Sequence, residues 1–276
     1  MNPTQASSHT PGIPEPAPAS VPALPRSTRR RTNASPPGMA DLWATIEAGR
    51  WFHALPAELA GQLKALAQPR ALGAGDWLFR RGDPACGLYA VARGALSISG
   101  TAACGEQART ALLALVEPPM WLGEIALLDG AQRTHDAQAA TASIVLHVPQ
   151  APLRDWLAAH PAHWQPLALL LTDKLRICLE ALEEQTLLPA PQRLARRLVR
   201  MAEGFDQWQP DGQGRQRWRR ELDVSQEQLA RMLGLSRQTT NQILQELQQA
   251  GCLQLRRGKL EVLDRQGLRD AGWITD

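Results

Sequence analysis

The chain contains 276 residues, 44% of them hydrophobic, and carries a formal net charge of +3. This length allows two domains that each bury a core. No apolar run approaches the roughly 20 residues that span a bilayer. The N-terminus lacks the charged-then-apolar order of a signal peptide, so we expect a cytoplasmic protein with no membrane partner.

The charge and the cysteines narrow the function classes further. Residues 189–276 carry 15 basic and 11 acidic side chains, whereas residues 39–188 carry 11 basic and 15 acidic ones. A basic C-terminal part suits a polyanionic partner. The four cysteines form no Cys-x-x-Cys pair and the six histidines show no His-x-His or His-x-x-x-His spacing, so we predict neither a disulfide framework nor a metal or iron–sulfur site.

The N-terminal half divides into a tail and a domain with short strands. Residues 1–38 are rich in Pro, Ala, Ser and Thr, a composition that predicts a disordered tail. Residues 39–163 begin with two short helical patterns and continue with alternating apolar runs. These runs predict strands of an antiparallel barrel or sandwich, at 76–80, 87–92, 95–99, 110–116 and 143–148.

Residues 164–188 predict one long helix with a narrow apolar seam. The seam residues recur at spacings of 4, 3, 4, 3 and 4, as in a two-stranded coiled coil. They are Trp164, Ala168, Leu171, Leu175, Cys178 and Leu182. We predict a dimerisation helix with Leu171, Leu175, Cys178 and Leu182 at the interface; the alternative is that the seam packs on the barrel of its own chain.

Residues 189–276 predict a compact helical domain that begins after Pro189-Ala-Pro191. Ser225 and Gln228 form a capping box, so a helix begins at Gln226. Gly234 ends that helix, and Ser236 caps the next one. Residues 252–263 predict a hairpin whose turn, at 257–259, carries basic residues suited to phosphate.

The second capped helix has one polar face and one apolar face. Ile243, Leu244 and Leu247 share the apolar face. Arginine, glutamine and asparagine make two-pronged hydrogen bonds to guanine and adenine edges in the major groove. The opposite face carries Arg237, Gln238, Asn241 and Gln242. A capped helix pair joined by a glycine turn therefore predicts double-stranded DNA binding, the alternative being a solvated polar face.

A second candidate site lies in the loop from Gly123 to Thr134. A glycine frees backbone N–H groups to approach an anion, and the guanidinium of Arg133 can bind a phosphate with two hydrogen bonds. An internal salt bridge between Glu124 and Arg133 is the alternative reading of the same residues.

The order of barrel, long helix and winged helix-turn-helix resembles the Crp/Fnr superfamily of bacterial transcription regulators. In the barrel, the resemblance rests on Gly82-Asp83, Leu88-Tyr89, Gly94, Gly123-Glu124 and Arg133-Thr134. In the DNA-reading unit it rests on Leu229-Ala230, Gly234-Leu235-Ser236-Arg237 and Thr239. It implies an α+β fold with an N-terminal cyclic-nucleotide-binding-type antiparallel β-barrel (jelly roll), a dimerisation helix, and a C-terminal winged helix-turn-helix.

The resemblance also implies a function and two sets of site residues. It implies a homodimeric regulator, not an enzyme, that binds a palindromic operator, contacts RNA polymerase, and is controlled by a small effector. The DNA-binding residues are Arg237, Gln238, Asn241, Gln242, Ser236 and Thr239. The effector residues are Gly123, Glu124, Arg133, Thr134, His135 and Cys178.

Three departures from the family bear on the effector. His135 stands where a small residue is usual, and Cys178 and Leu179 replace hydroxyl residues that contact adenine in the cyclic-AMP receptor. An unpaired buried amino group costs about 1–3 kcal/mol, which disfavours cyclic AMP and leaves the effector unidentified. The rival hypotheses are a ligand-independent regulator, a jelly-roll enzyme with a DNA-binding appendage, and a membrane-associated cyclic-nucleotide effector.

Overall fold

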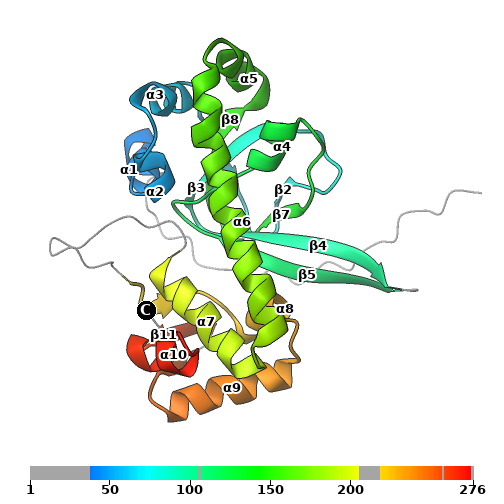
Figure 1. Ribbon diagram of the computed structural model, residues 1–276, viewed down its shortest axis with the longest axis vertical. Coiled ribbons are helices and arrows are strands. Elements are labelled where there is room, and N and C mark those ends of the chain that lie inside the picture. The colour runs from blue at the N-terminus through cyan, green and yellow to red at the C-terminus, as the bar shows by residue number, and fades with distance from the viewer. Residues whose placement is uncertain (1–37, 105–106, 205–217, 257, 275–276) are drawn as a thin grey trace, which may run out of the picture. The chain divides into compact units, whose positions relative to one another are not determined.

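The computed structural model describes residues 38–104, 107–204, 218–256 and 258–274 (Figure 1). The predicted disordered tail therefore lies outside the described residues, apart from Gly38 at its end. The N-terminal apolar patterns form three helices rather than the predicted two, because a four-residue turn of helix follows Gly49. The helices are α1 (Met39–Glu47), α2 (Arg50–His53) and α3 (Ala57–Leu66).

Eight strands follow, and their hydrogen bonds join them into two antiparallel four-stranded sheets. The first has the order β1-β8-β3-β6, with β1 (Gln68–Leu72), β8 (Ser143–Pro149), β3 (Gly87–Arg93) and β6 (Trp121–Leu122). The second has the order β2-β7-β4-β5, with β2 (Trp77–Phe79), β7 (Asp136–Ala139), β4 (Leu96–Cys104) and β5 (Gln107–Val116). The five predicted strands are confirmed. The two sheets are the layers of the predicted jelly roll, and the described strands do not close into one continuous barrel.

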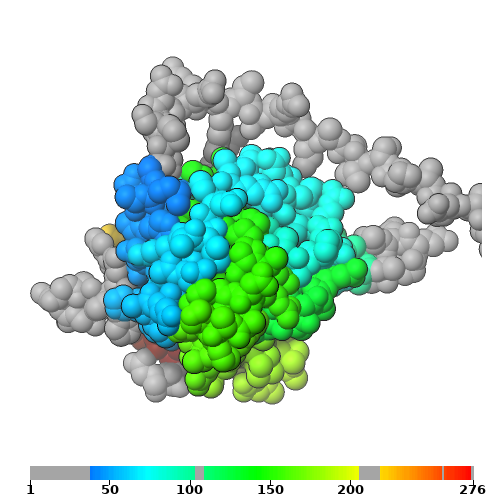
Figure 2. Space-filling view, turned by 90° about the horizontal axis from the view of Figure 1, so that it is seen from above, coloured from blue at the N-terminus to red at the C-terminus, as the bar shows by residue number. Residues whose placement is uncertain are grey.

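Strand β3 is buried on both faces, which explains its continuous apolar run. Successive side chains of a strand point to opposite faces. Tyr89 and Val91 belong to the core between the two sheets. Leu88 and Ala90 belong to a second core formed with the helices. Seen from above, α1 to α3 in blue lie beside the green helical segment that follows β8, and together they cover that outer face (Figure 2).

The green segment contains α5 (Gln150–Ala159), a 3₁₀ turn (Pro161–His163) and the long helix α6 (Trp164–Leu187). The predicted long helix is thus confirmed. Its first half joins the core of the outer face through Leu167 and Leu170. A further short helix, α4 (Glu124–Asp129), follows β6 and packs against α6. None of the helices in the described ranges combines the length and hydropathy needed to cross a bilayer.

The C-terminal part contains a further core, formed by apolar residues of its helices and its three-stranded sheet together with Leu115 of β5. The helices are α7 (Ala190–Glu203), α8 (Gln226–Leu233), α9 (Arg237–Gln249) and α10 (Arg265–Ala271). The sheet has the order β10-β11-β9, with β10 (Leu253–Arg256), β11 (Lys259–Val262) and β9 (Glu221–Leu222). The predicted hairpin is therefore confirmed, although its turn residue Arg257 lies outside the described residues.

Candidate functional site

The α8–α9 pair forms as its sequence predicts. Ser225 Oγ accepts a hydrogen bond from the backbone N–H of Gln228, whose side chain accepts one from the N–H of Ser225. Gly234 has φ +64°, the left-handed conformation that ends α8 at little cost for glycine. Ser236 Oγ then accepts from the N–H of Thr239 at 3.0 Å and caps α9. Local hydrogen bonds therefore fix both the start of α9 and its angle to α8.

Helix α9 buries one face and exposes the other. Ile243, Leu244 and Leu247 are buried in the C-terminal core. Buried Thr240 satisfies its hydroxyl by donating to the carbonyl of Ser236 at 3.0 Å. The opposite face is solvent-exposed, except for half-buried Asn241. The core therefore fixes the rotation of α9 about its axis, so its polar side chains point away from the domain.

The predicted DNA-reading residues differ in how firmly they are held. No hydrogen bond to another described residue engages the side chains of Arg237, Gln238 or Asn241. Gln242 Nε2 donates to Glu246 Oε1 at 3.1 Å, one turn further along α9. The hydroxyls of Ser236 and Thr239 bond to each other at 2.7 Å. The first three side chains are thus free to bind base edges, whereas the two hydroxyls already serve the cap.

The described cations of the β10–β11 hairpin, the wing of the domain, are paired within the chain. Arg256 forms an ion pair with Glu261 at 2.7 Å, and Lys259 Nζ lies 3.2 Å from carboxylates of both Glu221 and Asp223. The hydrogen bond to Asp223, followed by that to Glu221, raises the pKa of Lys259. The charges of Arg256 and Lys259 are therefore already partly neutralised by carboxylates of this chain.

The arginines of α7 bond to their own chain. Arg200 pairs with Glu184 near the end of α6, and Arg196 Nε donates to the carbonyl of Gly272 at 2.7 Å. Arg197 Nη2 donates to the carbonyl of Leu113 at 3.2 Å. These cations connect α7 to α6, to the C-terminal segment and to β5.

Gly123 and Arg133 come together at the start of α4. Arg133 is 4% exposed, and its guanidinium donates from Nη1 to the carbonyl of Gly123 at 3.1 Å and from Nη2 to that of Gly87 at 2.7 Å. The guanidinium also lies 4.4 Å from the ring centre of Phe79. Gly123 has φ +101°, and a Cβ there would lie 2.6 Å from the Gly87 carbonyl oxygen. Only glycine therefore allows this close approach.

Glu124 does not pair with Arg133, so the predicted alternative of a salt bridge between them is wrong. Glu124 is 3% exposed, and its Oε2 lies 2.8 Å from Nζ of Lys174 on α6. Lys174 also donates to the carbonyl of Trp121 at 2.7 Å. The acidic residue of the predicted effector site is therefore held by the long helix.

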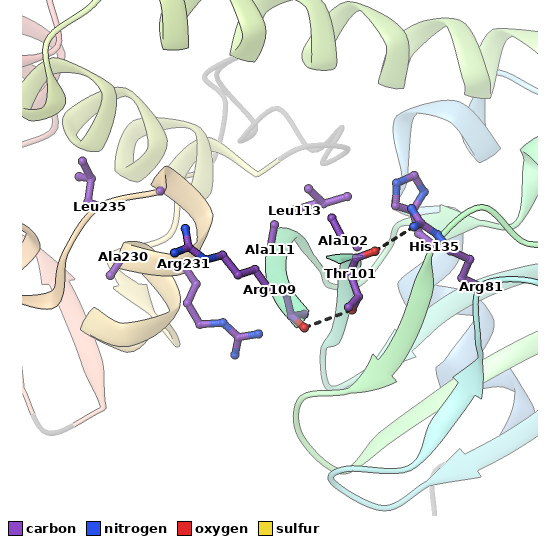
Figure 3. Close-up of a pocket in the computed structure, with 13 residues that line it drawn as sticks. Arg81, Thr101, Ala102, Arg109, Ala111, Leu113, His135, Ala230, Arg231 and Leu235 are labelled. Carbon is purple, nitrogen blue, oxygen red and sulfur yellow. Dashed lines mark hydrogen bonds between the residues drawn. The ribbon is translucent and has the colours of Figure 1, made fainter. Parts of the chain in front are cut away.

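His135 lies in a different environment from Arg133. The chain bends at Thr134 and His135, and His135 Nδ1 bonds to Thr134 Oγ1 at 2.9 Å. His135 lines a pocket of about 530 Å³ together with Arg81, Arg109 and Arg231 (Figure 3). Desolvation, followed by the charge of Arg81, lowers the pKa of His135. The described residues around this pocket include no carboxylate.

Cys178 and the other seam residues beyond the first half of α6 are exposed within one chain. Leu175 is 54% exposed, Leu182 is 63% exposed, and Cys178 is exposed between them. The alternative that the whole seam packs on its own barrel is therefore wrong for this half of the helix. Leu171 is half-buried.

Several residues of these sites were missed in the sequence. The region of Glu124 and Arg133 is contacted from distant parts of the chain by Lys174, Cys86 and Tyr89. The other pocket is lined from β5 by Arg109 and from α8 by Arg231 (Figure 3). The sequence contains no local signal for these contacts, because each depends on how separate elements pack.

The C-terminal domain presents a capped helix whose polar face points to solvent. A long helix joins this domain to a sheet domain that contains a buried arginine. This arrangement is that of a regulator that binds DNA. Comparisons with known proteins agree. Residues 69–160 match the model of the cyclic nucleotide-binding domain, and residues 192–271 match that of the Crp-like helix-turn-helix domain. The chain is a member of the Crp/Fnr superfamily of transcription regulators, whose members bind DNA as dimers.

Three relatives illustrate the similarity. The chain is 28% identical to the CRP-like cAMP-activated global transcriptional regulator of Mycobacterium tuberculosis, over 77% of this chain and 91% of the relative. It is 28% identical to the cyclic AMP receptor protein of Thermus thermophilus, over 76% of this chain and 91% of the relative. A solved CRP/FNR-family transcriptional regulator of Thermus thermophilus superposes with a TM-score of 0.56 at 25% identity, covering 75% of this chain and 98% of that one.

Proposed function

We propose that this regulator reads a palindromic operator with the exposed face of α9. Arg237, Gln238 and Asn241 contact base edges in the major groove, and Gln242 joins them when it leaves Glu246. Ser236 and Thr239 orient the start of the helix. The observation that carries this assignment is the exposed polar face, whose first three side chains have no hydrogen-bond partner among the described residues. Arginine suits guanine, and glutamine and asparagine suit adenine.

The operator can be identified by selecting binding sequences from random double-stranded DNA with the purified protein. We expect a palindrome whose half-sites are about one helical turn apart, because a two-fold dimer places two copies of α9 in successive major grooves. Arg237→Ala should weaken binding to the selected sequence by about tenfold or more, since a two-pronged contact contributes roughly 1–3 kcal/mol. Arg93→Ala, an exposed arginine on β3, is the matched control. Equal operator affinity of the two variants would refute the role of α9.

We also propose that two chains pair through the exposed seam of α6. Leu175, Cys178 and Leu182 share one stripe of the helix, together with half-buried Leu171. An apolar stripe with coiled-coil spacing buries its surface when it packs against an identical stripe. Dimerisation is typical of the family, and it supplies the second α9 that a palindrome requires.

The sheet domain is proposed to bind an anionic effector at Gly123, Glu124, Arg133 and Thr134; His135 belongs to the separate pocket, and Cys178 lies exposed on α6. The support is Arg133, a buried cation with no carboxylate partner among the described residues. Two relatives are named for a response to cyclic AMP, so cyclic nucleotides are the first compounds to test. An effector hydroxyl would have to displace Lys174 from Glu124.

The pocket lined by Arg81, Arg109 and Arg231 is a second candidate location for the effector. A thermal-shift screen with cyclic nucleotides separates the two. Arg133→Lys should abolish the shift if the effector binds beside Gly123, because lysine cannot make the two-pronged contact. Arg231→Ala should abolish it if the effector binds in the pocket. A screen in which no cyclic nucleotide raises the melting temperature would favour a ligand-independent regulator.

RNA polymerase is the proposed protein partner, because the family consists of transcription regulators. A gel shift with the selected operator, the protein and RNA polymerase tests this. We expect the polymerase complex to form on the operator only when the regulator is present.

A further inference from the structure

The thiol of Cys86 contacts the guanidinium of Arg133. Cys86 lies in the loop before β3, where Sγ accepts a hydrogen bond from Arg133 Nη2 at 3.1 Å. The hydroxyl of Tyr89 lies 3.1 Å from the same sulfur. The stacked ring of His147 lies 4.6 Å from that of Tyr89, and His147 Nε2 bonds to the Cys86 carbonyl. The sulfur is therefore held between a cation and a phenol.

Arg133 is short of hydrogen-bond acceptors. Two carbonyls and the sulfur engage its two terminal nitrogens, whereas its buried Nε has no partner among the described residues. No described carboxylate lies within salt-bridge distance of the guanidinium. Burying a cation without a counter-ion is costly. An anion next to Cys86 would relieve this cost, whether it came with a ligand or formed on the sulfur.

The surroundings of Cys86 differ from those of Cys178 and Cys252, the other cysteines whose side chains the structure describes. Cys252 is buried in the C-terminal core, and burial, followed by Asp264 and Asp270, raises the pKa of its thiol. Cys178 is exposed on α6. Cys86 is half-buried and is the one among these three that bonds to a cationic side chain. Reactive cysteines occur in such electropositive, partly accessible surroundings.

We propose that Cys86 is an oxidative modification site that controls the anion site at Arg133. Peroxide converts the thiol to a sulfur oxyacid, and the new oxygen accepts hydrogen bonds from Arg133. The oxidised side chain thereby takes the place of the effector's anionic group. The proposed control of effector binding rests on the effector site proposed above. The proposed reactivity of the Cys86 thiol with peroxide does not depend on that site.

The chemistry needs only hydrogen peroxide as oxidant. The sulfur attacks one peroxide oxygen, an S–O bond forms as the O–O bond breaks, and the thiol proton leaves with the released oxygen as water. The product is a sulfenic acid. A second peroxide converts it to a sulfinic acid and releases another water. Once ionised, the sulfinic acid presents a full negative charge to Arg133.

The first test measures the reactivity of Cys86 in the full-length wild-type protein. Peroxide is added with dimedone, which traps sulfenic acids, and the adducts at Cys86 and Cys252 are quantified by mass spectrometry. We expect Cys86 in the native protein to be labelled at least about fivefold faster than in the urea-unfolded protein, because folding brings Arg133 to the sulfur. Cys252, the matched control, should be slower in the native protein. Slower labelling of native Cys86 would overturn the proposal.

A variant checks the cause of the reactivity. Arg133→Gln removes the cation, so the native Cys86 labelling rate should fall at least to that of the unfolded chain. An unchanged native rate in folded Arg133→Gln would exclude Arg133 as the activating group. If this variant fails to fold, the comparison of native and unfolded wild-type protein still decides the reactivity.

The second test asks whether oxidation occupies the anion site. The melting shift caused by cyclic AMP is measured before and after peroxide treatment, in wild type and in Cys86→Ser. We expect peroxide to abolish the shift in wild type and to leave it unaltered in Cys86→Ser. A shift that survives sulfinic acid formation at Cys86 would overturn the control of binding. If Cys86 is labelled fast but cyclic AMP shifts the melting temperature of neither untreated protein, the effector site is refuted instead.

Discussion

Lys174 Nζ lies 2.8 Å from Glu124 Oε2, and this ion pair links the long helix to the start of α4. Glu124 is nearly fully buried and Lys174 is largely so. A charge buried without its partner destabilises the fold, whereas removing both charges costs much less. The pair therefore makes the loop that begins at Gly123 and the long helix α6 dependent on each other.

Lys174→Met should lower the free energy of unfolding by roughly 2–4 kcal/mol, because it leaves the Glu124 carboxylate buried without its cation. The double variant Lys174→Met with Glu124→Gln should regain at least half of that loss. Urea unfolding followed by circular dichroism measures both values. A double variant no more stable than Lys174→Met would mean that the two side chains do not act as a pair.

Leu175→Glu combined with Leu182→Glu should convert the dimer to monomers, because two charges per chain would be buried in the seam. Sedimentation velocity measures the outcome. Leu169→Glu is the matched control, since Leu169 is 52% exposed on the same helix but lies off the stripe. Monomers of the control, or dimers of the double variant, would place the interface elsewhere.

Cys178 offers an independent test of the same interface. If α6 pairs in parallel about a two-fold axis, the two copies of Cys178 face each other in the seam. Mild oxidation with diamide should then produce a disulfide-linked dimer on non-reducing electrophoresis. Cys178→Ser should not form it, and a crosslink that persists in this variant would have to come from another cysteine.

His135 should make the protein less stable in weak acid. Because the folded-state pKa of His135 is lowered, the unfolded chain binds its proton more readily, so stability falls as pH decreases below about 6.5. His135→Gln should reduce the drop in melting temperature between pH about 7.5 and about 5.5. Since the imidazole is partly exposed, we expect a small effect. An equal or larger drop in the variant would contradict this assignment.

Ser225→Ala should destabilise the start of α8 by about 1 kcal/mol, because it removes the hydroxyl that caps the N–H of Gln228. Hydrogen exchange of the α8 amides measures this local change. Ser99→Ala, the same substitution at a half-buried strand position, is the control. Faster α8 exchange in the control than in Ser225→Ala would exclude the cap as the cause.

The parts of the fold that were predicted correctly depend on residues close together in sequence. The cap at Ser225 spans three residues, and the strand and helix periods are read over one element. The partner of Glu124 could not be predicted in this way, because Lys174 lies 50 positions away on another element. Cys86 and Arg133 are similarly separated by 47 positions.

The placement of His135 shows a second limit of sequence reasoning. The resemblance to the family implied that His135, directly after Arg133-Thr134, would belong to the site of Arg133. The chain bends at these residues before β7 begins, and His135 then lies with Arg81 in the pocket. Strand alternation applies only inside a strand, so it cannot orient residues in a bend.

The pairing of Glu184 with Arg196 and Arg200 limits how this protein can be recombined with its relatives. The connection between α6 and α7 is made by side chains on both sides of a domain boundary, and the Glu184 side chain is only 12% exposed. A chimera that joins α6 of this chain to a foreign DNA-binding domain must therefore supply arginines at both positions. Without these arginines, Glu184 would have neither cationic partner, and the chimera would lose the ion pairs that hold α7 in place against α6.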